Sequence, residues 1–145
     1  MECEIPHINI NDDAIIQNIF KTCKSIAIIG LSPDPTKDSH KVALFLQEQG
    51  YKIFPIYPKG EMILDEKVYR SILEIDENVD MVVMFRKPEI ATTLIEEVLQ
   101  RNDIKVFWLQ LGIINNQACQ KAKESGLLTV QNKCTKVEYE RLMKK

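Results

Sequence analysis

The chain has 145 residues, which fits a single domain, and its 45% hydrophobic and 28% charged residues are ordinary for a globular protein. A formal net charge of -2 argues against general nucleic-acid binding, because that function normally requires a basic surface. No apolar run approaches the length of a membrane span.

The first predicted element is a helix with Asn11 as its N-cap that runs to about Lys24. Its apolar stripe consists of Ile15, Ile16, Ile19 and Phe20. We expect residues 1–24 to pack on the sheet as an N-terminal helical addition to a single domain that covers residues 1–145.

Strands and helices then alternate along the chain. Strands are expected at residues 25–30, 51–57, 79–85, 104–109 and 127–131. Helices are expected at residues 37–49, from Pro88, from Asn116 to Gly126, and from Thr135, which forms a capping-box pattern with Glu138. The segment 59–78 interrupts the rhythm with a short extended piece at 62–64 and a short helix at 71–75. The pattern predicts an α/β, Rossmann-like three-layer fold with a five-stranded parallel sheet in the order 3-2-1-4-5.

The loop after the first strand has the position of a phosphate-binding loop. Gly30 fills the first place of a G-x-G-x-x-G pattern, but Ser32 and Pro35 occupy the other two glycine places. The Ser32 hydroxyl can donate to a phosphate oxygen, as can the backbone N–H groups of the following helix. Further donors on that helix are Lys37, Ser39 and Lys41. The alternative is a structural turn with solvated lysines.

The end of the second strand distinguishes between nucleotides. A site for NAD places an acidic residue here to hold the ribose hydroxyls, whereas this chain has Tyr57, Pro58 and Lys59. Lys59 suits a phosphate on the ribose, as in NADP or coenzyme A, unless it is simply a solvated lysine.

Three residues after later strands are candidates for ligand contact. Arg86 follows the third strand, where it makes either a bidentate phosphate contact or an ion pair with Glu89. Gln110 suits a ligand amide, and Gly112 allows close backbone approach, unless both belong to a plain turn at the end of the strand.

The sequence offers no convincing catalytic set. His40 fits best as a satisfied or solvated side chain and Cys134 as a buried inert thiol. No Ser/His/Asp set or carboxylate pair follows the strands. The four cysteines are scattered without a C-x-x-C pair, which predicts free thiols in a reducing cytoplasm and no zinc site. The acidic start lacks the features of a signal peptide, which also favours the cytoplasm.

Six blocks, in the same order, resemble the small stand-alone CoA-binding domain proteins, whose fold is that of the CoA-binding domain in the succinyl-CoA synthetase α-subunit. The blocks are Gly30–Pro33 with Lys37–Val42, Pro55–Lys59, Val68–Tyr69 with Ser71–Ile72, Phe85–Arg86, Trp108–Gly112 and Cys134–Tyr139. The sequence departs from the family pattern at Leu31, Tyr57, Arg70 and Thr135. Tyr57 either stacks on adenine or weakens the site.

The resemblance implies binding of coenzyme A or an acyl-CoA without a defined reaction, because the synthetase's catalytic histidine and its nucleotide-grasp partner lie outside this domain. It implies phosphate contacts from the first loop and helix, with Lys59 near the 3′-phosphate. Tyr57 and Pro58 would flank the adenosine, and Arg86 and Gln110 would contact the diphosphate or pantetheine. The residues expected to bind the cofactor are Gly30, Leu31, Ser32, Pro33, Lys37, Ser39, His40, Lys41, Tyr57, Pro58, Lys59, Phe85, Arg86, Gln110 and Gly112.

Two other functions also fit the sequence. One is an NADP-linked oxidoreductase, against which the missing glycines and the lack of an obvious proton donor count. The other is an interaction module without a ligand that docks on an acyltransferase or a ligase. Both a monomer and a homodimer fit the sequence.

Overall fold

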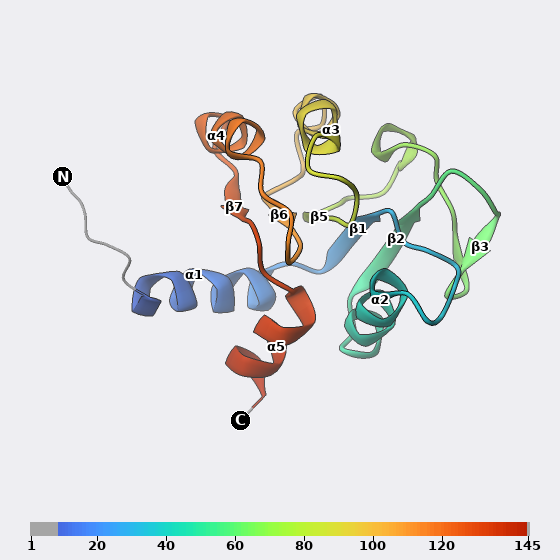
Figure 1. Ribbon diagram of the computed structural model, residues 1–145, viewed down its shortest axis with the longest axis horizontal. Coiled ribbons are helices and arrows are strands. Elements are labelled where there is room, and N and C mark those ends of the chain that lie inside the picture. The colour runs from blue at the N-terminus through green and yellow to red at the C-terminus, as the bar shows by residue number, and fades with distance from the viewer. Residues whose placement is uncertain (1–8, 145) are drawn as a thin grey trace.

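Five parallel strands form the central sheet of the computed structural model, which describes residues 9–144. The strands are β1 (Ser25–Ile29), β2 (Lys52–Ile56), β5 (Met81–Met84), β6 (Val106–Leu109) and β7 (Leu128–Val130). Helices cover both faces of the sheet, which confirms the predicted Rossmann-like α/β fold (Figure 1). The strands lie where the sequence predicts them, with ends shorter by one or two residues.

The predicted strand order of 3-2-1-4-5 is wrong. The order is β2-β1-β5-β6-β7, so the third main strand lies beside the first and not beyond the second. All four residues of β5 are 0% exposed, and such a strand is most stable in the middle of a sheet. Pro55 has no N–H to donate, and at the outer edge of β2 it breaks no bond to β1.

The helices form two layers, one on each face of the sheet. One layer contains α1 (Asn9–Thr22), α2 (Asp38–Glu48) and α5 (Thr135–Met143), and the other contains α3 (Ile90–Val98), α4 (Asn116–Glu124) and the 3-10 helix η1 (Ile72–Glu74) (Figure 1). The helix expected from Pro88 is α3, and its apolar side chains Ala91, Leu94, Ile95 and Val98 are buried against the sheet. No helix within residues 9–144 is long and apolar enough to cross a membrane.

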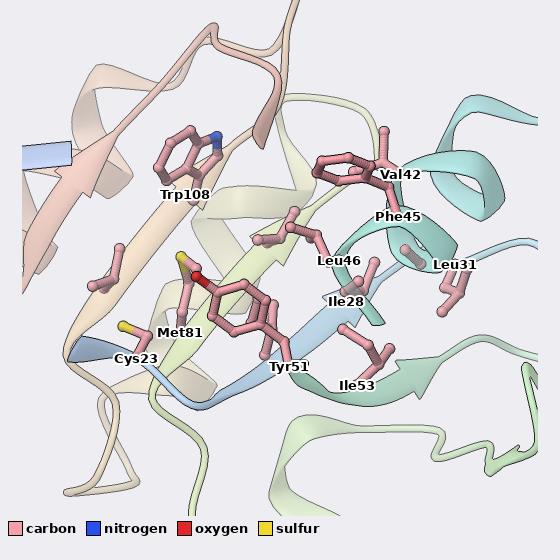
Figure 2. Close-up of a cluster of buried hydrophobic side chains, with 14 of the residues drawn as sticks. Cys23, Ile28, Leu31, Val42, Phe45, Leu46, Tyr51, Ile53, Met81 and Trp108 are labelled. Atoms are coloured by element: carbon pink, nitrogen blue, oxygen red, sulfur yellow. The ribbon is translucent and has the colours of Figure 1, made fainter. Parts of the chain in front are cut away.

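Aromatic side chains hold the first layer to the sheet. Trp108 is fully buried, and its indole Nε1 donates to the Lys133 carbonyl at 2.8 Å. The Phe20 ring lies 5.6 Å from that of Trp108, and Tyr139 of α5 packs edge-on against Phe20 at 5.2 Å. Figure 2 shows Trp108 and Tyr51 within this cluster. Burying such a ring contributes roughly 1.5–3 kcal/mol, so this layer anchors the start of α5 firmly.

Two sequence expectations about α1 need correction. The helix begins at Asn9, so Asn11 is not its N-cap. Ile15 remains 45% exposed, while Ile16, Ile19 and Phe20 are buried. Residues 1–8 of the expected N-terminal addition lie outside the described residues.

The segment between β2 and β5 forms a short hairpin and η1. Strands β3 (Met62–Ile63) and β4 (Glu66–Lys67) pair in antiparallel fashion around Leu64 and Asp65, which both have positive φ as a tight hairpin turn requires. The chain then returns along the outer edge of β2, where the Tyr69 N–H donates to the Pro55 carbonyl at 2.9 Å. This contact partly covers an edge that would otherwise be open.

The amino edge of the sheet, where the parallel strands begin, is closed by hydrogen bonds. The Asp80 carboxylate accepts from the Lys24 N–H at 2.7 Å, the Ser25 N–H at 3.3 Å and the Asn78 amide at 2.8 Å. The Arg101 guanidinium donates to the carbonyls of residues 72, 75 and 77 and pairs with Asp103 at 2.7 Å. These contacts hold the connection that brings β5 beside β1.

Candidate functional site

Phe85 and Arg86 directly follow β5, where the order of the sheet reverses. From β1 the chain moves outward to β2, and from β5 it moves the other way through β6 and β7. Ligands of open parallel sheets bind beyond the carboxyl ends of the strands at such a switch point. Phe85 lines a cavity on the side of α2, and Arg86 lines one on the side of α3.

Gly30 allows Arg86 to cross the end of β1. Its φ of +84° lies in the left-handed region, and its N–H donates to the Ile56 carbonyl at 2.8 Å. A Cβ at this position would come within 2.8 Å of the Arg86 Cδ. The side chain of Leu31 is fully buried in the core, so only its backbone faces the edge.

The loop between β1 and α2 is held by its own hydrogen bonds. The Ser39 hydroxyl accepts from the Ser32 N–H at 3.0 Å, and His40 Nδ1 lies 2.8 Å from the Ser32 carbonyl. The Ser32 hydroxyl accepts from the Asp34 N–H at 3.1 Å, so its own proton is free to donate to a ligand. Ser39 and His40 therefore shape the loop, and Pro33 is exposed on it.

The N-terminus of α2 opens at the same edge. Lys37 is the N-cap residue and is exposed, and its side chain makes no capping bond. Within residues 9–144, the N–H groups of Asp38 and Ser39 have no acceptor. Unfilled N–H groups at a helix start are favourable partners for an anion.

The α3-side cavity has a volume of about 240 Å³ and lies between the end of β2 and α3. It is lined by Ile29, Ile56, Tyr57, Pro58, Arg70, Ser71, Ile72, Arg86, Ile90, Thr93, Leu94 and Glu97. Two guanidinium groups and one carboxylate give it a net positive lining. Arg86 forms no ion pair with Glu89, which was the alternative to a ligand contact.

The α2-side cavity has a volume of about 500 Å³, which is within the usual range for ligand pockets. It is lined by Asp38, Lys41, Val42, Phe85, Gln110, Leu111, Ile113, Cys134, Lys136 and Val137. Two lysines and one aspartate stand among mainly apolar side chains.

Gln110 is fixed within the α2-side cavity with an open donor. Its side-chain Oε1 accepts from the Thr135 N–H at 3.0 Å, which determines which way round the amide lies. Its Nε2 has no acceptor among residues 9–144, although the residue is only 3% exposed. Gln110 lines the cavity and its Nε2 is not shut off from it, so an acceptor on a ligand would be well placed there.

The capping box that the sequence predicts between Thr135 and Glu138 at the start of α5 is wrong. Cys134 is the N-cap residue, and the Glu138 N–H donates to the Cys134 carbonyl at 2.9 Å. The Thr135 hydroxyl is buried and has no hydrogen-bond partner in the part of the chain that the structure describes. Gln110 from the end of β6 meets the start of α5 instead.

Many of the predicted residues lie at the carboxyl edge of the sheet, but not all of them line a cavity. Lys59 and Lys37 are exposed and line neither cavity. The Gly112 N–H donates to the Asn132 side chain at 2.7 Å, which makes Gly112 part of a strand-end turn. The prediction missed Arg70 and Lys136 as lining residues, although the first stands at a departure from the family pattern.

The described residues contain no group of three or more His, Cys, Asp and Glu side chains that could hold a metal ion. Cys23, Cys119 and Cys134 are free thiols. Burial raises the pKa of Cys23 to about 11 and also raises that of Cys119.

A family model described as a CoA binding domain matches residues 24–140. The chain belongs to the CoA-binding domain family. Protein YneT of Bacillus subtilis (strain 168) is 38% identical over 126 residues, covering 87% of this chain and 93% of YneT. A solved structure of a hypothetical protein from Pyrococcus horikoshii OT3 has 37% sequence identity and a TM-score of 0.88, with 99% of each chain covered.

A larger relative shares part of the domain. The ADP-forming acetate–CoA ligase II of Archaeoglobus fulgidus is 34% identical over 80 residues, covering 54% of this chain and 12% of the ligase. These relatives confirm the family resemblance drawn from the sequence blocks.

Proposed function

We propose that this protein binds coenzyme A, free or acylated, along the carboxyl edge of its sheet. One observation carries the proposal: two cavities with basic linings lie on either side of the β1–β5 switch point, and the open N-terminus of α2 lies beside one of them. Membership of the CoA-binding domain family supports the class of ligand.

The diphosphate of coenzyme A matches the start of α2. The open N–H groups of Asp38 and Ser39, the Ser32 hydroxyl and the ammonium groups of Lys37 and Lys41 can all donate to phosphate oxygens. The Asp34 carboxylate faces inward to its own loop, because it accepts from the Thr36 N–H and hydroxyl at 2.9 and 2.8 Å.

The adenosine matches the α3-side cavity. Tyr57 and Pro58 offer flat surfaces to a base, and the guanidinium groups of Arg70 and Arg86 suit the 3′-phosphate. Lys59 lies two residues beyond Tyr57 and is exposed, so it can add a charge from outside the cavity. Arg70 already donates to the Tyr57 carbonyl at 3.2 Å, which ties the Arg70 side chain to the backbone of this wall.

The pantetheine arm matches the α2-side cavity, because that arm is uncharged and contains two amides. Phe85, Val42 and Val137 offer apolar surface to its carbon chain. The open Nε2 of Gln110 would donate to one of its amide carbonyls. The proposal is one of binding, and the cytoplasmic location expected from the free thiols stays a prediction.

Calorimetric titration with coenzyme A tests this proposal. We expect Lys37→Ala to weaken binding about tenfold, because a charged hydrogen bond contributes roughly 1.5 kcal/mol, and Ser32→Ala to weaken it less. Lys123→Ala is the matched control, since this exposed lysine lies in the last turn of α4.

Three results would contradict the proposal or its phosphate site. Undetectable binding at millimolar coenzyme A would leave the interaction module as the better hypothesis. Tighter binding of NADPH than of coenzyme A would favour the oxidoreductase. Unchanged affinity in both Ser32→Ala and Lys37→Ala would remove the phosphates from the start of α2.

A further inference from the structure

The α2-side cavity contains a thiol that the proposed function does not use. Cys134 lines this cavity together with Gln110, and its side chain is partly exposed. It is a free cysteine and the N-cap residue of α5.

The position of Cys134 is fixed by its two neighbours. The carbonyl of Lys133 accepts from the buried Trp108 indole at 2.8 Å, and the Thr135 N–H donates to the Gln110 side chain at 3.0 Å. Both partners lie on or directly after β6. The thiol is therefore held at a set place in the wall of the cavity and does not belong to a loose loop.

The other thiols in the described part of the chain are closed off. Cys23 is 2% exposed and Cys119 is 4% exposed. Burial raises the pKa of both groups, which keeps them protonated at neutral pH. These two cysteines provide internal controls for the accessible one.

Gln110 offers a ligand a polar contact in the same cavity, independently of the thiol. Its side chain is 3% exposed, and its Nε2 donor has no partner among residues 9–144. If coenzyme A binds as proposed above, an amide of its pantetheine arm fills that donor. The arm ends in a thiol, so a second sulfur would enter the cavity that Cys134 lines.

We propose that Cys134 forms a reversible mixed disulfide with coenzyme A, with CoA disulfide as the co-reactant. This inference rests on the proposed function. The Cys134 thiol loses its proton, and its sulfur attacks one sulfur of CoA disulfide. A bond forms between Cys134 and that CoA, the bond within CoA disulfide breaks, and the released CoA thiolate takes up a proton. Attack by the thiolate of a second coenzyme A on the CoA sulfur of the mixed disulfide re-forms CoA disulfide and releases the Cys134 thiolate, which reverses the step.

The charges around the cavity select for this partner over other disulfides. Lys41 and Lys136 line the cavity, and the open start of α2 adds N–H donors for phosphate. Glutathione disulfide offers only carboxylates and no diphosphate, so it would gain less from these donors. Binding before reaction raises the effective concentration of the reacting sulfur, so we expect the adduct with CoA disulfide to form at least about tenfold faster.

Mass spectrometry of the reduced protein treated with CoA disulfide or glutathione disulfide tests the inference. We expect a CoA moiety on Cys134, located by peptide mapping and removed by dithiothreitol. The adduct should be absent from Cys134→Ser and retained in Cys119→Ser. A thermal melt of each variant checks that it folds, and Cys134→Ala serves if the serine variant does not.

Calorimetry with reduced protein and reduced coenzyme A separates the two proposals. If coenzyme A binds but no adduct forms, the function stands and the inference is overturned. Equal rates with both disulfides, or an adduct on another cysteine, also overturn it. If coenzyme A does not bind, both proposals fail.

Discussion

The polar groups at the amino and carboxyl edges of the sheet differ in whether they have hydrogen-bond partners within the chain. At the amino edge, Asp80 and Arg101 use their polar atoms on partners within the chain. At the carboxyl edge, the Gln110 Nε2 and the Thr135 hydroxyl lack partners within residues 9–144, and Arg86 pairs with no carboxylate of that range.

This difference separates stability from binding. A buried polar group that is satisfied within the chain adds stability, and one that is left open costs it. At the carboxyl edge the buried Thr135 hydroxyl therefore costs stability, whereas the donors that reach the cavities are available to a ligand. We expect substitutions at the amino edge to change folding and substitutions at the carboxyl edge to change binding.

The largest effect is expected from Asp80→Ala. It leaves the N–H groups of Lys24 and Ser25 without their acceptor at a buried position. We expect the free energy of unfolding to fall by about 3 kcal/mol, measured by urea denaturation. Asp80→Asn serves if the alanine variant does not fold. A loss below about 1 kcal/mol would contradict the role given to this edge.

Acid should abolish the difference in stability between wild type and Asp80→Ala. Burial opposes ionisation of Asp80, but hydrogen bonds from the Lys24 N–H, Asn78 and the Ser25 N–H hold its pKa below the ordinary value of 3.8. The carboxylate therefore stabilises the fold above about pH 4, and this contribution is lost as the pH falls through the lowered pKa. The stabilities of wild type and Asp80→Ala should converge in that range.

A smaller effect is expected from Lys41→Ala, which removes a charge from the α2-side cavity. We expect coenzyme A to bind about tenfold more weakly in calorimetry at low salt, with a smaller difference at high salt because the side chain is exposed. Lys105→Ala is the matched control, because that exposed lysine lies 3.7 Å from Asp80 at the amino edge. Equal losses in the two variants would mean that the ligand senses only overall charge.

The smallest effect is expected from Thr135→Val. This change removes a buried hydroxyl that has no partner within residues 9–144 and keeps the shape of the side chain. The free energy of unfolding should rise by about 0.5–1 kcal/mol, seen as a higher melting temperature. Thr22→Val is the control, because the Thr22 hydroxyl donates to the Asn18 carbonyl at 2.9 Å. A clear loss of stability in Thr135→Val would show that its hydroxyl is satisfied.

The local features of the fold could be predicted from the sequence. The apolar run of β5 and the stripe of α3 each lie within a few residues, where periodicity is informative. The strand order depends on contacts such as that of Asp80 with Lys24, 56 positions apart. Pro55 in β2 carried a signal for an edge strand that the prediction did not use.

The candidate site could be predicted only in part, for the same reason. Parallel strands bring their carboxyl ends to one edge, so the positions of Gly30, Arg86 and Gln110 followed from the strand ends alone. The orientation of the Gln110 amide depends on the Thr135 N–H, 25 positions later. The capping box was predicted from a local pattern, but the Thr135 N–H donates to Gln110, and Cys134 is the N-cap residue. The ligand contacts themselves stay predictions.

Phe85 and Arg86 are adjacent in the chain, yet they line cavities on opposite faces of the sheet. If coenzyme A binds as proposed, each half of it would contact its own position, and the two positions could vary independently. A change at Phe85 would then affect the contacts of the uncharged arm and leave those of the nucleotide end, and a change at Arg86 would do the reverse. Inserting one residue after Met84 would exchange the two faces and disrupt both halves at once.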